Sequence, residues 1–156
     1  MLSCLDLPTP VGTLRLLAAE DTLLGLRVAG QRRPEVPARQ EVTPTLRAAA
    51  DWLERYFAGL SPDPDALPLR PVGTDFQLSV WAALRRIPYG TTASYGSLAR
   101  SLHTAPRAVG VAAGRNPLLI LIPCHRLIGA DGSLTGYAGG LAVKEALLRL
   151  EGSWPV

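Results

Sequence analysis

The sequence Leu118-Leu119-Ile120-Leu121-Ile122-Pro123-Cys124-His125-Arg126 contains five apolar residues, a proline, and then a cysteine beside a histidine. The apolar run is typical of a buried β-strand, and we expect it to carry Cys124 to the edge of the core. A thiol becomes a strong nucleophile near neutral pH once a neighbour helps to remove its proton, and His125 is such a neighbour. The alternative is an inert buried cysteine beside a solvent-facing histidine.

The composition indicates the broad class of protein. The chain has 156 residues, so it is long enough for one full core or two small lobes. Of these residues, 47% are hydrophobic and 19% charged. No apolar run is long enough for a membrane span, and the N-terminus has no signal-peptide pattern. Two cysteines, Cys4 and Cys124, do not make a disulfide framework, so we expect a cytoplasmic protein. We expect no metal site, because the sequence has no CxxC and no Cys/His cluster.

The charge is distributed unevenly along the chain. The formal net charge is +3, but residues 76–130 contain no acidic residue at all. The arginines in this stretch are Arg85, Arg86, Arg100, Arg107, Arg115 and Arg126. Such a segment attracts anions and predicts a nucleic-acid-binding surface. The alternative is a chance distribution, with the arginines spread over several faces.

The N-terminal part predicts a small antiparallel sheet packed against a helix. We expect strands at 2–7, 13–19 and 23–29, with Glu20-Asp21 as a hairpin turn and 30–43 as a loop. Thr43-Pro44 predicts the start of a helix, and Gly59 its end. Residues 61–71 include four prolines, so we expect them to connect an N-terminal lobe (1–72) to a C-terminal lobe (73–156).

The C-terminal part predicts several short helices. Thr74-Asp75-Phe76-Gln77 is a capping box at the start of the first of them. Ser94 can cap a second helix, and Arg107 to Gly114 predicts a third that is rich in small residues. Two short helices joined by a tight turn fit a helix-turn-helix motif, although an ordinary helical hairpin is the alternative. A final helix is expected at 141–150.

Five motifs in one order make this chain closely resemble the O6-alkylguanine-DNA alkyltransferase family, also called methylated-DNA–protein-cysteine S-methyltransferases. They are Arg107-Ala108-Val109-Gly110, Asn116-Pro117, Ile122 to Arg126, Gly136-Tyr137-Ala138-Gly139-Gly140, and Lys144-Glu145 through Glu151-Gly152. The resemblance covers nearly the whole chain. It implies an α+β fold of two lobes, in which a ribonuclease H-like N-terminal lobe has a small antiparallel sheet with a helix. The C-terminal lobe would be mostly helical and winged-helix-like, with the helix-turn-helix and the active-site cysteine.

The resemblance implies DNA repair by direct reversal. One alkyl group would move irreversibly from O6-alkylguanine in double-stranded DNA to Cys124, so that each molecule reacts once; O4-alkylthymine is a second candidate substrate. His125 would take the thiol proton, Glu151 would orient His125, and Asn116 would brace the turn behind the cysteine. The resemblance implies no metal and no organic cofactor, and we expect a monomer without membrane association.

The resemblance also assigns residues to the DNA. Because the reacting atom lies in the base stack, the nucleotide must rotate out of the duplex. Arg107 would fill the vacated space, and Tyr95 would press on the flanking phosphate and bind the flipped base. The residues expected to contact DNA are Arg107, Tyr95, Ala108, Gly110 and Arg115, and those expected to line the base pocket are Tyr137, Ala138 and Pro123. The alternatives are a core tyrosine at position 95 and a simple phosphate contact by Arg107.

Two features depart from the usual form of the family. The turn from Leu102 to Arg107 is shorter, which affects the reach of Arg107, and Ala138 stands where a hydroxyl residue is common.

Two other functions stay open from the sequence. One is a catalytically silent relative that only binds lesions, and the other is a thiol hydrolase that uses Cys124 and His125.

Overall fold

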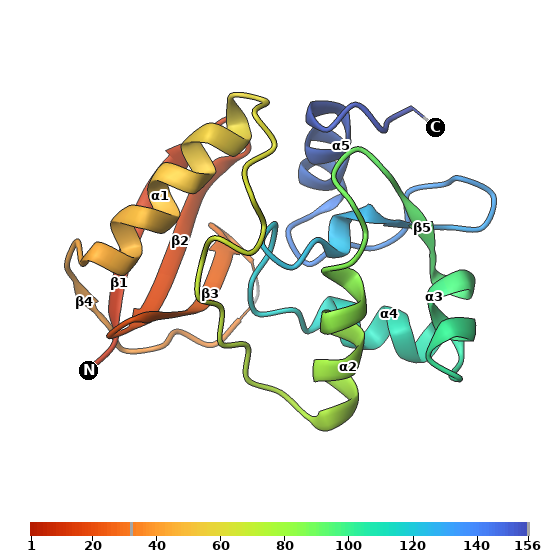
Figure 1. Ribbon diagram of the computed structural model, residues 1–156, viewed down its shortest axis with the longest axis horizontal. Helices are drawn as coiled ribbons and strands as arrows, with labels where there is room; N and C mark the ends of the chain where they lie inside the picture. The colour runs from red at the N-terminus through yellow and green to blue at the C-terminus, as the bar shows by residue number, and fades with distance from the viewer. Residues whose placement is uncertain (32, 156) are drawn as a thin grey trace.

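The computed structural model describes residues 1–31 and 33–155 (Figure 1). A sheet covered by one long helix occupies one side of the molecule, and shorter helices occupy the other (Figure 1). In chain order the elements are β1 (Ser3–Thr9), β2 (Gly12–Ala19), β3 (Thr22–Val28), β4 (Arg39–Gln40), α1 (Pro44–Phe57), α2 (Asp75–Leu84), β5 (Ala93–Ser94), α3 (Tyr95–Ser101), α4 (Pro106–Gly114), the 3-10 helix η1 (Cys124–Arg126), β6 (Leu127–Ile128) and α5 (Leu141–Leu150). This mixed α+β architecture confirms the predicted fold class.

The N-terminal sheet has the strand order β3-β2-β1-β4. The first three strands form the antiparallel meander that the sequence predicts, and the alternating residues Leu14, Leu16 and Ala18 of β2 are buried. The prediction of a loop over 30–43 is wrong at one point, because β4 pairs in parallel with β1 through Ser3 and Cys4. A strand of two exposed residues has no hydrophobic alternation, so the sequence pattern gave no sign of it.

Helix α1 packs on this sheet with one apolar face. The Thr43 side chain accepts a hydrogen bond from the Leu46 amide at 3.2 Å, and Pro44 occupies the first helical position. The buried residues of the helix are Leu46, Ala49, Trp52, Leu53 and Tyr56. Tyr56 lies near the C-terminal end of α1, which brings its hydroxyl group to the junction with the rest of the molecule.

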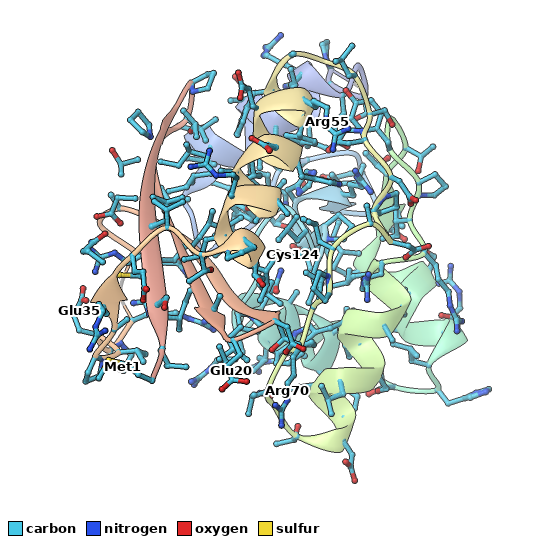
Figure 2. The ribbon with its side chains drawn as sticks, turned by 60° about the vertical axis from the view of Figure 1, so that its left-hand side comes forward. Met1, Glu20, Glu35, Arg55, Arg70 and Cys124 are labelled. Carbon is cyan, nitrogen blue, oxygen red and sulfur yellow. The ribbon has the colours of Figure 1, made fainter. Side chains whose placement is uncertain are left out.

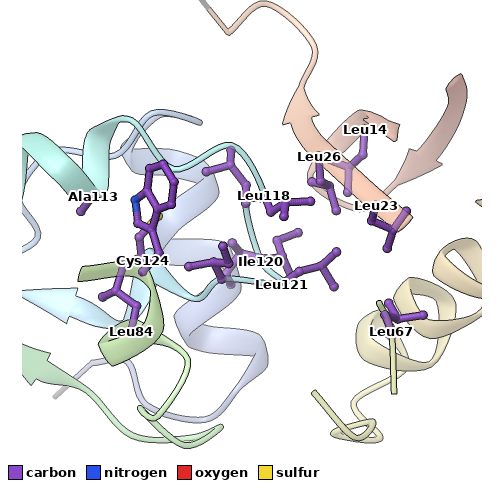
Figure 3. Packing of buried hydrophobic residues seen from close by; sticks show 14 of the residues in the cluster. Leu14, Leu23, Leu26, Leu67, Leu84, Ala113, Leu118, Ile120, Leu121 and Cys124 are labelled. Atoms are coloured by element: carbon purple, nitrogen blue, oxygen red, sulfur yellow. The ribbon is translucent and has the colours of Figure 1, made fainter. Parts of the chain in front are cut away.

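The prediction of a strand over Leu118 to Ile122 is wrong. Ile120 has a φ of +71°, and the Leu121 amide donates to the Leu119 carbonyl at 2.8 Å, so the backbone turns tightly. Figure 3 shows Leu118, Ile120 and Leu121 between the sheet residue Leu26 and the side of the core that holds Cys124. The run is apolar throughout because it is buried on all sides, and a continuous apolar run alone does not distinguish a strand from a buried turn.

The helices of the C-terminal part follow the predicted order. The side chain of Ser94 caps α3 by accepting from the Ser97 amide at 3.0 Å. Residues 102–105 join α3 to α4, and His103 takes a φ of +55° in this tight turn. The short parallel pair of β5 and β6 has no counterpart in the sequence prediction, because each strand has only two residues.

The two sides of the molecule share backbone hydrogen bonds and one hydrophobic core. The Leu26 amide donates to the Pro117 carbonyl at 2.9 Å, and the Leu119 amide donates to the Leu26 carbonyl at 3.1 Å. The buried apolar cluster runs continuously from the sheet to the final helix. The lobe boundary near residue 72 stays a prediction.

Within the described part of the chain, no helix is long and apolar enough to cross a membrane.

The capping box of α2 gives a test of this local structure. Thr74 accepts from the Gln77 amide at 3.1 Å, and the Gln77 side chain accepts from the Thr74 amide at 3.0 Å. Thr74→Ala should lower the free energy of unfolding by about 1 kcal/mol. The control is Ser79→Ala on the exposed face of the same helix, which should change it by less than about 0.5 kcal/mol. Urea denaturation measures both variants, and equal effects would contradict the capping role.

Candidate active site

Cys124 begins the 3-10 helix η1, and Asn116 fixes the turn that precedes it. The Asn116 side-chain nitrogen donates to the Ile122 carbonyl at 2.7 Å and to the Cys124 sulfur at 3.2 Å. The Asn116 side-chain oxygen accepts from the Leu118 amide at 2.9 Å. Asn116 is fully buried, so these bonds do not compete with water. The Asn116 side chain therefore links Leu118 and Ile122, the two ends of the apolar turn, and also contacts the Cys124 thiol.

The Cys124 thiol lies in the interior, near the centre of the molecule (Figure 2). Burial raises its pKa to about 11, although the hydrogen bond from Asn116 and the charge of Lys144 act in the opposite direction. The thiol is therefore protonated at neutral pH in the resting protein. A nucleophilic reaction at this sulfur needs a base that takes the proton.

His125 and Glu151 form a buried pair beside the cysteine. The distance between His125 Nε2 and Glu151 Oε2 is 2.7 Å. Burial alone would raise the pKa of Glu151, but the hydrogen bonds and charges of His125 and Arg126 outweigh it and lower this pKa to about 2. An ionised carboxylate only accepts hydrogen bonds, so Nε2 carries a proton. Burial lowers the pKa of His125, which keeps the ring neutral and leaves the lone pair of Nδ1 available.

Nδ1 of His125 has no hydrogen-bond partner among the described residues, although it is buried. A buried nitrogen with a free lone pair is suited to accept a proton from a neighbouring thiol, directly or through one water molecule. The sequence assigned this task to His125, and the assignment stays a prediction. The expected pairing of His125 with Glu151 is present, at 2.7 Å.

Two further residues also bind Glu151. The sequence interpretation gave Tyr56 no role, and it counted Arg126 among the arginines of a nucleic-acid-binding surface, whereas Arg126 is buried against Glu151. The Arg126 guanidinium donates to both carboxylate oxygens, at 2.7 Å from Nε and 3.1 Å from Nη2, and its Nη1 donates to the Ile87 carbonyl at 2.6 Å. The Tyr56 hydroxyl donates to Glu151 Oε2 at 2.6 Å. Arg126 adjoins His125 in the sequence, and this position was a usable sign of its place in the site. Tyr56 lies 95 residues from Glu151, so no sequence pattern indicated its contact.

A cavity of about 560 Å³ opens beside Cys124. It brings together most of the residues that the sequence assigned to the substrate and the DNA. The lining residues from that set are Tyr95, Arg107, Gly110, Cys124, Tyr137 and Ala138. The cavity has the size of a site for a small ring-shaped molecule. The shorter turn before Arg107 therefore still brings this residue to the same cavity as the sulfur.

Tyr137 forms one wall of this cavity. Its ring meets the His125 ring edge-on, with 6.5 Å between the centroids. The Tyr137 hydroxyl group is buried and has no hydrogen-bond partner in the described part of the structure. A group that accepts or donates a hydrogen bond inside the cavity would satisfy it.

Three predicted residues lie outside the lining of this cavity. Ala108 lies at a separate hollow on the surface of α4, and Arg115 lies in a groove that adjoins the cavity at Gly114 and Ala138. Pro123 was expected in the base pocket, but it lines a different cavity at the junction with α1. The backbone turns at Pro123, so its ring and the Cys124 sulfur face opposite sides.

Lys144 is a further residue that the sequence interpretation did not assign. Its buried ammonium group donates to the Thr135 carbonyl at 2.7 Å and to the Gly136 carbonyl at 3.3 Å, and it lies 5.7 Å from the Tyr95 ring centre. Burial lowers its pKa to about 8. Lys144 therefore ties the loop before Tyr137 to α5. Its signal in the sequence was that it is the single lysine of the chain.

In residues 1–31 and 33–155, no three His, Cys, Asp or Glu side chains lie close enough to hold a metal ion.

Comparisons with known proteins point to one family. The family model described as 6-O-methylguanine DNA methyltransferase, DNA binding domain, matches residues 75–153. The chain is 48% identical to a methylated-DNA–protein-cysteine methyltransferase of Methanosarcina acetivorans over 93% of this chain and 95% of that protein. It is also 48% identical to the protein of the same name in Mycobacterium tuberculosis, over 93% of this chain and 89% of the relative.

Solved structures give the same result for the fold. The structure of Mycobacterium tuberculosis O6-methylguanine methyltransferase has a TM-score of 0.86 and 42% identity, covering 98% of this chain and 94% of that one. Mycobacterium tuberculosis OGT in complex with DNA has a TM-score of 0.86 and 43% identity, covering 97% and 92%.

The high pKa of Cys124 predicts how the DNA-free protein reacts with a small thiol reagent such as iodoacetamide. Because only the thiolate reacts, the rate at Cys124 should keep rising between about pH 7 and about pH 10.5. Glutathione, as the control, should level off above the ordinary thiol pKa of about 8.5–9. Peptide mass spectrometry measures the rate at Cys124. A plateau near pH 9 at this residue would contradict the assigned shift.

Proposed function

This chain belongs to the O6-methylguanine-DNA methyltransferase family, and we propose that it transfers an alkyl group from O6-alkylguanine in double-stranded DNA to Cys124. It is a DNA-repair alkyltransferase. The observation that carries the choice of Cys124 is its place in a base-sized cavity beside the buried His125–Glu151 pair. The other cysteine, Cys4, is buried in the N-terminal sheet without such a pair.

The transfer consists of one proton movement and one displacement. His125 Nδ1 takes the thiol proton of Cys124, and the resulting imidazolium is stabilised by the carboxylate of Glu151. The sulfur then forms a bond to the alkyl carbon while the bond from that carbon to O6 breaks. The electron pair of this bond stays on the guanine, which takes up one proton, equal in number to the one lost by the thiol, and remains in the DNA as the repaired base. The sulfur ends as a thioether, which is why each molecule acts once.

The substrate base has to reach the sulfur from outside the duplex. We propose that it rotates into the cavity between Tyr95 and Tyr137, and that Arg107 fills the gap in the stack. Small residues on α4, among them Ala108 and Gly110, permit close approach to the sugars of the minor groove. Arg115 adds a phosphate contact at the adjoining groove.

The proposal includes the narrower features expected from the sequence. They are a monomer in the cytoplasm that needs no cofactor, the lobe boundary near residue 72, and O4-alkylthymine as a second substrate. A catalytically silent lesion binder would have no use for a cysteine with a base and an orienting acid beside it. A thiol hydrolase would leave the α3–α4 pair and the acid-free arginine segment unexplained.

Intact mass spectrometry tests the proposal directly. After incubation with a duplex that contains O6-methylguanine, the protein should gain the mass of one methyl group on Cys124, and no more. Cys124→Ser should gain nothing, whereas Cys4→Ser should react like the wild-type protein. Binding of the duplex without a mass change would favour the silent lesion binder, and turnover of an ester by unmodified protein would favour the hydrolase.

Arg107→Ala separates base flipping from chemistry. The variant should repair duplex DNA at least about 10-fold more slowly, because flipping costs a few kcal/mol. Its reaction with free O6-benzylguanine should change by less than about 2-fold, since a free base needs no flipping. Arg47→Ala on the exposed face of α1 is the matched control and should leave both rates unchanged. Equal losses on both substrates would show that Arg107 supports the fold instead.

A further inference from the structure

One oxygen of Glu151 receives hydrogen bonds from both halves of the chain. Oε2 accepts from His125 Nε2 at 2.7 Å and from the Tyr56 hydroxyl at 2.6 Å. Arg126 holds the other oxygen, Oε1, at 2.7 Å and reaches Oε2 at 3.1 Å. The N-terminal helix α1 therefore supplies a donor to the same atom that orients the proposed base.

The position of the Tyr56 hydroxyl is set by rigid packing. The ring is 1% exposed and stacks on Trp52 with 5.6 Å between centroids and 8° between planes. It also meets Phe57 and Tyr89 edge-on, at 5.2 Å and 6.1 Å. Burial, together with the charge of Glu151, raises the pKa of Tyr56, so the phenol stays protonated and remains a donor. The hydroxyl thus has one geometry before any substrate binds.

We propose that Tyr56 is a positioning residue for the transfer reaction at Cys124, acting through Glu151 on His125. The inference rests on the proposed function. By donating to Oε2, Tyr56 holds the carboxylate in the plane that His125 needs and withdraws part of the negative charge from that oxygen. Less charge on Oε2 stabilises the imidazolium of His125 less, so the ring stays neutral down to a lower pH.

The charged and titratable groups around His125 define the sign of this effect. Glu151 favours the protonated ring, whereas Arg126, Lys144 and burial oppose it. Tyr137 faces the ring edge-on and is itself uncharged, because burial raises its pKa. Removing the Tyr56 hydroxyl leaves the carboxylate charge less dispersed. The pKa of His125 should then rise, and the ring should be protonated over a wider range of acidic pH.

Tyr56→Phe tests the inference, because it removes one hydroxyl group and keeps the ring. The matched control is Tyr89→Phe, which removes a hydroxyl from the same aromatic cluster; that hydroxyl donates to the Leu150 carbonyl at 3.4 Å and not to Glu151. Single-turnover rates are measured with saturating protein and a duplex containing O6-methylguanine, over a range of pH, and thermal unfolding is measured for each variant.

The expected result is a specific change in the chemistry. Tyr56→Phe should react about 3- to 10-fold more slowly near neutral pH, because Glu151 is then held by one hydrogen bond fewer and orients His125 less well. The acidic limb of its pH–rate profile should move up by roughly half a pH unit. Tyr89→Phe should keep the wild-type profile. A merely structural role would lower the melting temperature and the reactive fraction but leave the acidic limb in place.

A second substitution keeps the test independent of folding. Site-specific incorporation of 3-fluorotyrosine at position 56 keeps the hydroxyl and makes it a stronger donor, so the acidic limb should move down. Unshifted limbs in both position-56 proteins, or the same shift in Tyr89→Phe, would overturn the inference. Failure of the wild-type protein to methylate Cys124 would instead overturn the proposed function, so the two failures are distinguishable.

Discussion

The structure depends on the cost of placing the charge of Glu151 inside the core. A buried carboxylate is tolerated only where donors replace its water, and here Tyr56, His125 and Arg126 do so. The donors come from α1 and from η1, while Glu151 itself ends α5. Satisfying one charge therefore requires that the sheet-bearing half, the cysteine turn and the final helix meet at one point. The base next to the nucleophile is a consequence of the same arrangement.

The cysteine turn shows a second constraint of the same kind. The segment from Leu118 to Ile122 lies between the sheet and the helices (Figure 3). It is an irregular buried turn, so its backbone groups need hydrogen-bond partners in the absence of water. Asn116 supplies both a donor and an acceptor to this segment, and its remaining contact is the Cys124 sulfur. The residue that makes the buried turn possible is thus also the residue that touches the nucleophile.

The sequence predicts what is encoded locally. Thr43, Thr74 and Ser94 cap their helices as expected, because a cap depends on residues three positions apart. The pair of Cys124 and His125 and the resemblance to a family led to Asn116 and Glu151. The sequence did not predict the turn at Ile120, the side to which Pro123 points, or the bond from Tyr56, since each depends on packing between distant segments. No periodic pattern in the sequence indicates such contacts.

The electrostatics of the site suit a protein that reacts once. Burial keeps the Cys124 thiol protonated, and thiolates are the species that stray oxidants and electrophiles attack. The groups that favour the thiolate, Asn116 and Lys144, are present but do not outweigh burial in the resting state. In the proposed mechanism, proton transfer to His125 creates the nucleophile, and it is useful only when an alkylated base already fills the cavity. A freely exposed low-pKa cysteine would react faster with DNA but would also be consumed by reactions that repair nothing.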